Sequence, residues 1–133
     1  MNAVFADTSA LYALLDRDDD NHTAAVERLS KISSVGASLV TSNYILVETC
    51  ALVQRRIGQA ALSAFHKVAA SSLTIHWVTQ RQHELGMAAV LAAARRKLSL
   101  VDCVSFAVMR DLRIQAAFAF DQHFRDEGFV LKL

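Results

Sequence analysis

Short, uninterrupted apolar runs alternate along the chain with longer segments that have helical periodicity. We predict buried strands where the apolar runs are short, at 3–6, 38–40, 73–78, 116–120 and 129–133. Helices are predicted between them, at 9–15, 21–32, 43–56, 59–70, 80–96 and 101–112. Strands that alternate with helices are typical of βα units and of a mainly parallel sheet covered on both faces. The pattern therefore predicts an α/β fold whose ligands bind beyond the carboxyl ends of the strands.

The composition is that of one ordinary globular domain. The 133 residues include no proline and only four glycines, which favours helices with short connections over a turn-rich β-sandwich. No repeat or linker divides the chain, so we expect a single domain over residues 1–133. The apolar stretches are too short for a membrane span and the N-terminus does not resemble a signal peptide. We therefore expect a cytoplasmic protein with no membrane partner.

The charge is nearly balanced, with 14 basic and 13 acidic residues and a net charge of +1. Any binding to nucleic acid must then come from local basic patches. The candidates are Arg55 with Arg56, the stretch 95–97, and Arg110 with Arg113. Solvated helix ends that complement the helix dipoles explain most of them, and the alternative is that one pair lines the groove and binds phosphates. Cys50 and Cys103 have no CxxC spacing and are expected to be buried free thiols.

Two predicted strands end in the same way. The run AVFA leads into Asp7, and the run AAFAF leads into Asp121. If both strands are parallel and close to the centre of the sheet, the two carboxylates face the same crevice. Taken singly, each aspartate is also explained as the start of a loop or as a helix cap. The matched placement favours a shared site.

Glu48 lies in the middle of an apolar segment of the predicted helix 43–56. Its neighbours one turn away are Tyr44, Ile45, Ala51 and Leu52. We therefore expect a buried carboxylate, which is stable only when it is paired with a cation, protonated or bound to a metal. A structural pair with an arginine remains an open alternative.

Asp102 follows Ser99 by three residues, as in a capping box. In that motif Ser99 is the N-cap, and the acid at the third helical position accepts a hydrogen bond from the amide of Ser99. A helix N-terminus at the crevice also aims a carboxylate into it, and Ser105, one turn further, is placed to hold that carboxylate by a hydrogen bond. Both roles are compatible.

Four carboxylates in one crevice would repel each other unless a cation neutralises them. Because no histidine or cysteine lies at ligand spacing, the set is expected to suit Mg²⁺ or Mn²⁺ better than zinc. His123, two residues after Asp121, is expected to pack rather than to face substrate, and Trp77 is expected in the core.

Five segments together resemble the PIN-domain nucleases, most closely the VapC-type toxins of toxin–antitoxin systems. They are DTSALYALL at 7–15, NHTAA at 21–25, SNYILVET at 42–49, LSLVDCVSFAVMRD at 98–111 and FAFDQHF at 118–124. Each motif alone is weak, but the ordered set covers nearly the whole chain.

The resemblance implies a three-layer α/β/α fold with a five-stranded sheet, and Mg²⁺- or Mn²⁺-dependent hydrolysis of RNA. The family's acidic ligands correspond to Asp7, Glu48, Asp102 and Asp121, and none is missing. The matching positions that support these ligands are Thr8 and Ser9, expected to orient Asp7, and Ser105.

Members of the family are commonly homodimers, and in the toxin branch a small antitoxin inserts a segment into the active-site groove. The leading hypothesis is therefore a metal-dependent endoribonuclease that acts as the toxin of such a pair. The alternatives are a housekeeping RNA-processing nuclease and a non-catalytic relative that binds RNA or a partner protein through the same groove.

Overall fold

The computed structural model describes residues 2–93 and 98–132. Five strands form one sheet in the order β3-β2-β1-β4-β5, and every neighbouring pair is parallel. The strands are β1 (Ala3–Ala6), β2 (Ser38–Ser42), β3 (Thr74–His76), β4 (Ala116–Phe118) and β5 (Val130–Leu131). The predicted α/β class and the five-stranded parallel sheet are confirmed.

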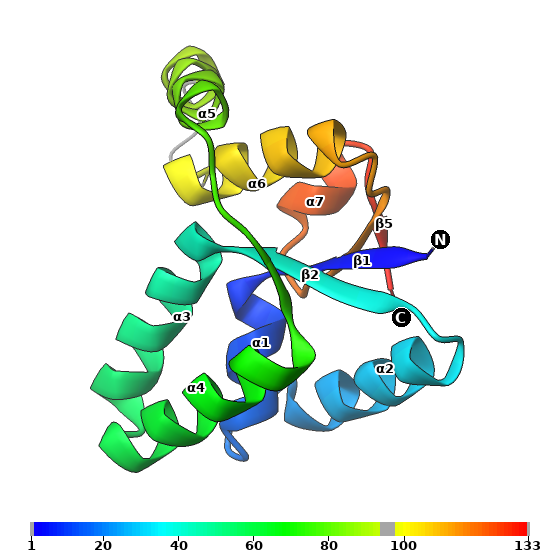
Figure 1. Ribbon diagram of the computed structural model, residues 1–133, viewed down its shortest axis with the longest axis vertical. Helices are drawn as coiled ribbons and strands as arrows, with labels where there is room; N and C mark the ends of the chain where they lie inside the picture. Colours follow the sequence, from blue (N-terminus) through cyan, green and yellow to red (C-terminus); the bar gives the residue numbers. More distant parts are fainter. Residues whose placement is uncertain (1, 94–97, 133) are drawn as a thin grey trace.

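Helices cover both faces of this sheet, which gives three layers (Figure 1). The helices α1 (Thr8–Leu15), α2 (His22–Ser34), α3 (Asn43–Arg56) and α4 (Gln59–Ser72) lie on one face. The helices α5 (Gln80–Ala93), α6 (Leu100–Asp111) and α7 (His123–Asp126) lie on the other. Right-handed crossovers explain the arrangement. Helices that connect β1 to β2 and β2 to β3 lie on one face, and helices that accompany the return of the chain to β4 and β5 lie on the other.

The chain reverses its winding direction between β1 and β4. From β1 it runs outward to β2 and β3, and it then crosses to β4 on the opposite side of β1. The two strands are fully apolar because helices cover both faces; Phe5 pairs with Ala117, and both are completely buried. A crevice at the carboxyl ends of β1 and β4 is therefore the expected ligand site of this sheet.

The element boundaries agree with the predictions to within two residues, except at the end of the helix predicted at 80–96. The strand predicted at 73–78 has only three residues, and Trp77 follows it with 71 % of its surface exposed. The expectation of a core tryptophan is wrong because β3 is an edge strand whose chain leaves the sheet before residue 77. The helix predicted at 80–96 is observed to Ala93, and its last residues lie outside the described part.

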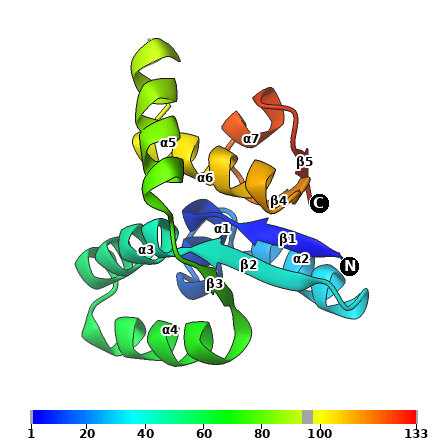
Figure 2. The same cartoon turned by 45° about the horizontal axis from the view of Figure 1, so that its top comes forward.

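Helix α5 projects from the body and packs mainly on α6 (Figure 2). The two helices meet at Gly86, where an added Cβ would lie 2.4 Å from Cγ2 of Val104. Helix α5 also leaves the apolar side chains of Leu85, Met87 and Leu91 exposed. Among the described helices none has both the length and the apolar character that crossing a membrane requires.

Candidate active site

The four predicted acids line one groove of about 540 Å³ at the carboxyl ends of β1 and β4. Its walls come from the N-termini of α1 and α6, from the middle of α3 and from the loop after β4. The lining residues are Asp7, Thr8, Ser9, Glu48, Ala51, Leu52, Arg55, Ser99, Asp102 and Asp121. Residues far apart in the sequence thus converge where the winding of the sheet reverses.

Asp7 follows β1 directly and is the N-cap of α1. Its Oδ2 accepts hydrogen bonds from the hydroxyl of Ser9 at 2.8 Å and from the amide of Ser9 at 3.2 Å. The same hydroxyl accepts a hydrogen bond from the amide of Phe120 at 3.0 Å, which ties the start of α1 to the loop after β4. The expected contact between Ser9 and Asp7 is present, and it holds the carboxylate in one orientation.

Burial raises the pKa of Asp7 from 3.8 to about 7. The residue is only 5 % exposed, so the charged form loses most of its hydration. The hydrogen bonds from Ser9 oppose the rise, whereas the neighbouring carboxylates of Asp102 and Glu48 add to it. The ionised form of Asp7 is therefore unfavourable unless a cation lies close by.

Glu48 reaches the groove from α3, but it is exposed, which corrects the expectation of a buried carboxylate. The core face of α3 is formed instead by Ile45, Thr49 and Val53. The apolar neighbours of Glu48 border the groove, since Leu52 is one of its lining residues. Of the four predicted neighbours, only Ile45 lies in the core, and the side of the helix that carries Glu48 contacts the groove and solvent.

Thr8 also differs from expectation. Its hydroxyl donates to Oε1 of Glu48 at 2.5 Å, so it orients Glu48 rather than Asp7. The hydroxyl of Thr49 in turn donates to Oγ1 of Thr8 at 3.3 Å. The two hydroxyl residues after Asp7 therefore serve two different carboxylates, one on each side of the groove.

Asp102 is held by the predicted capping box at the start of α6. Its Oδ2 accepts from the amide of Ser99, and the hydroxyl of Ser99 accepts from the amide of Asp102, both at 3.0 Å. The expected hydrogen bond from Ser105 to Asp102 is not formed. Oγ of Ser105 is buried and has no hydrogen-bond partner among the described residues. The carboxylate of Asp102 bends back toward the amide of Ser99, which accounts for the missing contact with the next turn.

Asp121 lies three residues after the last residue of β4, in the loop that leads to α7. Its Oδ1 accepts from the amide of His123 at 2.9 Å, and its side chain is 33 % exposed. The ring of His123 faces the acids, with Nδ1 3.1 Å from Oδ1 of Asp121 and 3.2 Å from Oδ2 of Asp102. The expectations that His123 packs and that no histidine lies at ligand distance are therefore wrong.

The donor set of the groove fits a divalent cation. Oδ2 of Asp102, Oδ1 of Asp121 and Nδ1 of His123 lie within 4.8 Å of one another. Within the described part of the chain, the arginine ion pairs bind other acids, Arg81 with Asp111 and Arg110 with Glu127. The four groove acids are therefore left without a lysine or arginine partner there, and a bound metal ion would supply the missing positive charge.

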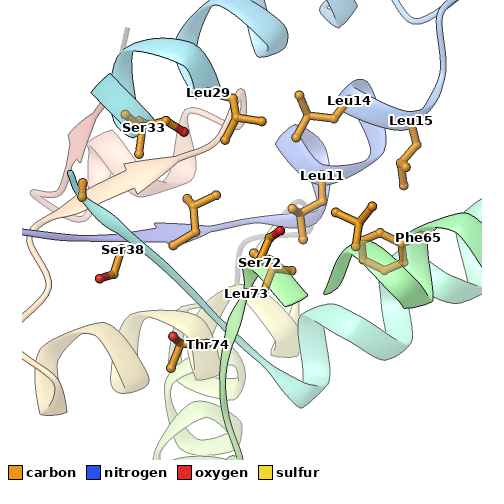
Figure 3. A pocket seen from close by; sticks show the side chains of 14 residues that line it. Leu11, Leu14, Leu15, Leu29, Ser33, Ser38, Phe65, Ser72, Leu73 and Thr74 are labelled. Carbon is orange, nitrogen blue, oxygen red and sulfur yellow. The ribbon is translucent and has the colours of Figure 1, made fainter. Parts of the chain in front are cut away.

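A second cavity, of about 390 Å³, lies between α1, α2, α4 and the edge of the sheet (Figure 3). Its lining residues are Leu11, Leu14, Leu15, Leu29, Ile32, Ser33, Ala37, Ser38, Leu39, Phe65, Val68, Ser72, Leu73 and Thr74. None of these side chains is an acid, a base or a metal ligand of ordinary strength. The acidic groove, and not this cavity, therefore holds side chains that can bind a metal ion or transfer a proton.

Comparison with known proteins gives a consistent assignment. The family model described as PIN domain matches residues 4–129. The 23S rRNA-specific endonuclease VapC20 of Mycobacterium tuberculosis is 36 % identical over 128 residues, which cover 96 % of this chain and 95 % of VapC20.

Solved structures agree with this match. The crystal structure of VapC20, described as a Sarcin-Ricin loop cleaving toxin, superposes with a TM-score of 0.84 at 33 % identity and covers 96 % of each chain. The VapBC2 structure from Rickettsia felis, solved with a DNA fragment from its promoter, gives a TM-score of 0.71 at 11 % identity, over 97 % of this chain and 96 % of that one. The second likeness concerns the fold alone. The chain belongs to the PIN domain family.

Proposed function

We propose that the protein is a divalent-metal-dependent endoribonuclease whose metal ligands are Asp7, Glu48, Asp102 and Asp121. The observation that carries the proposal is their convergence in one groove, with Asp7 buried and no lysine or arginine paired to them in the described residues. A groove that only binds RNA gains nothing from four carboxylates that repel phosphate. The 36 % sequence identity to an RNA endonuclease over 96 % of the chain supports the same activity.

The metal is proposed to be Mg²⁺ or Mn²⁺, because the four acids offer hard oxygen ligands. When bound, such an ion supplies an activated water and neutralises charge that develops on a phosphodiester. The chain's own residues position the ligands. Ser9 fixes Asp7, Thr8 fixes Glu48, and the capping box fixes Asp102 at the helix N-terminus. This preorganisation matters because small displacements of reacting groups are costly in rate.

Arg55 is the basic residue that we propose binds RNA in the groove. It lines the groove two helical turns beyond Glu48 and is exposed. Its neighbour Arg56 points elsewhere, with its guanidinium 5.4 Å from the centre of the Tyr12 ring. Arg110 is paired with Glu127 at 3.0 Å. The basic stretch at 95–97 lies outside the described residues. An arginine beside the acids is well suited to contact a phosphate oxygen of the bound strand.

The proposed biological role is that of a toxin in a type II toxin–antitoxin pair, with a cognate antitoxin as partner and the cytoplasm as the place of action. VapC20 is described as a 23S rRNA-specific enzyme and as a toxin, so the Sarcin-Ricin loop is the first RNA to test. Growth arrest on expression, relieved by the product of a neighbouring reading frame, tests the role.

A homodimer is also proposed, and the exposed Leu85, Met87 and Leu91 of α5 are candidates for its interface.

The activity is tested with purified protein and an RNA oligonucleotide that carries the Sarcin-Ricin loop. We expect cleavage with Mg²⁺ or Mn²⁺, none with EDTA, and none by the Asp102→Asn variant purified in the same way. Equal cleavage by parent and variant would show that the activity is a contaminant. If calorimetry detects no divalent binding by the parent, the proposal fails in favour of a non-catalytic, RNA- or partner-binding protein.

A further inference from the structure

His123 lies beside two of the groove acids, and the four predicted carboxylates do not account for its position. Its side chain is 19 % exposed, and Nδ1 lies 3.1 Å from Oδ1 of Asp121 and 3.2 Å from Oδ2 of Asp102. These two aspartates come from different elements, the loop after β4 and the N-terminus of α6. The ring nitrogen therefore contacts two carboxylates that come from separate parts of the chain.

The backbone around His123 is held in place by the core. The next residue, Phe124, is completely buried, with its ring centre 5.2 Å from that of Phe106 and 6.5 Å from that of Phe5. Phe124 anchors α7 in the core, and Asp121 accepts a hydrogen bond from the amide of His123. The imidazole therefore has little freedom to move away from the acids.

The spacing of the three atoms matches part of a coordination shell. Ligands roughly 2.1 Å from an ion with octahedral geometry lie about 3 Å from their nearest neighbours in the shell. The two separations from Nδ1 have this length, and all three atoms lie within 4.8 Å of one another. A neutral imidazole nitrogen is also among the commonest metal ligands in proteins.

We propose that Nδ1 of His123 is a direct ligand of the divalent cation held by Asp102 and Asp121. This rests on the proposed function and deepens it, because it turns an all-oxygen donor set into a mixed one. Nitrogen ligands favour transition-metal ions over Mg²⁺. The site therefore prefers Mn²⁺ to Mg²⁺ more strongly than the four carboxylates alone would. The competing role is a histidine that only hydrogen-bonds the carboxylates and does not touch the metal.

Pulsed electron paramagnetic resonance of Mn²⁺ bound to the full chain separates these roles. Electron spin echo modulation detects a nitrogen bonded to the ion, and its frequencies change when the histidines carry ¹⁵N in place of ¹⁴N. We expect such a nitrogen coupling in the parent and in the His66→Ala control, which removes an exposed histidine of α4. We expect it to disappear in His123→Ala and in His123→Asn.

Metal affinity gives a second measurement. In His123→Ala the ratio of Mn²⁺ to Mg²⁺ affinity, measured by calorimetry, should fall, because the nitrogen ligand that favours Mn²⁺ is lost. If the parent binds Mn²⁺ without a histidine nitrogen coupling, the inference is wrong while the proposed function stands. Coupling that persists in both His123 variants also overturns it. If the parent binds Mg²⁺ but no Mn²⁺, only this inference is wrong; if it binds neither ion, the proposed function fails as well. Isotope labelling of the parent decides the question even if a variant folds poorly.

Discussion

Helix α1 contributes to two regions of opposite chemistry. Its first turn, with Thr8 and Ser9, lines the acidic groove, and its later turns place Leu11 and Leu14 in the wall of the apolar cavity. The groove brings together like charges, whereas the cavity contains no titratable side chain. One short helix therefore supports the proposed catalytic site at one end and the stability of the fold along the rest.

The two regions make opposite contributions to the free energy of unfolding. Gathering carboxylates in a partly dehydrated groove destabilises the metal-free fold, as the raised pKa of Asp7 indicates. Apolar side chains around the cavity stabilise the fold by leaving water. Substitutions in the groove should therefore change activity without loss of stability, and substitutions around the cavity should do the reverse.

The largest expected effect is on RNA cleavage by Asp7→Asn. The substitution removes a buried metal ligand, so the cleavage rate should fall by about 10³-fold. The midpoint of thermal unfolding in EDTA at pH 8 should stay the same or rise, because a buried charge is removed while Asn still accepts from Ser9. The control is Asp18→Asn, an exposed acid outside the groove, which should leave both measurements unchanged. A large loss of stability in Asp7→Asn would contradict the proposed division between the two regions.

The apolar region is tested by Phe65→Ala. Phe65 is buried in the cavity wall, so its loss should lower the free energy of unfolding by about 3–5 kcal/mol, measured by urea denaturation. Val68→Ala is the matched control on the same helix, since Val68 lines the same cavity but is exposed and should cost less than about 1 kcal/mol. Cleavage per folded molecule should be unaffected in both. A lower rate in folded Phe65→Ala would show that the regions are coupled through α1.

The sequence was sufficient to predict the features that depend on local pattern. The strand β1, the helix α3 and the capping box at Asp102 agree with prediction because each is specified by nearby residues. The shared site of Asp7 and Asp121 followed from two strand ends and the rule for parallel sheets. These inferences need only the spacing of hydrophobic residues along the sequence and the direction of the strands.

The remaining features depend on contacts that the pattern does not contain. The apolar face around Glu48 borders the groove, and no periodicity distinguishes such a face from one in the core. Trp77 is exposed because β3 is short and lies at the edge of the sheet. The orientation of His123 follows from α7, a helix of four residues that is too short to show a helical repeat. The spacing of His123 from Asp121 was the available signal.

A smaller effect is expected in the pH dependence of stability without metal. Folded Asp7 has a pKa of about 7 and the unfolded residue about 3.8, so between these values the folded state binds more protons. Stability should therefore fall as pH rises, by about 2 kcal/mol between pH 5 and pH 7 from this group. Urea denaturation in EDTA measures it. Asp7→Asn should remove this part of the dependence of the unfolding free energy on pH. Phe65→Ala should lower the unfolding free energy by the same amount at every pH and leave its pH dependence unchanged. An unchanged slope in Asp7→Asn would mean that another group causes it.

The smallest expected effect concerns RNA binding by Arg55, the cation within the acidic groove. The measurement uses an Asp102→Asn background, which prevents cleavage. In it, Arg55→Ala should weaken RNA binding by about tenfold. The slope of log affinity against log salt concentration should fall by the amount expected for roughly one lost phosphate contact. Arg56→Ala is the matched control, because Arg56 lies over Tyr12 and does not line the groove. Fluorescence anisotropy at several salt concentrations measures both. Equal losses in the two variants would mean that the helix end attracts RNA only through its overall charge. A loss of RNA affinity confined to Arg55→Ala would show that the groove binds phosphate as well as metal. The apolar cavity could do neither, because its lining has no charged side chain.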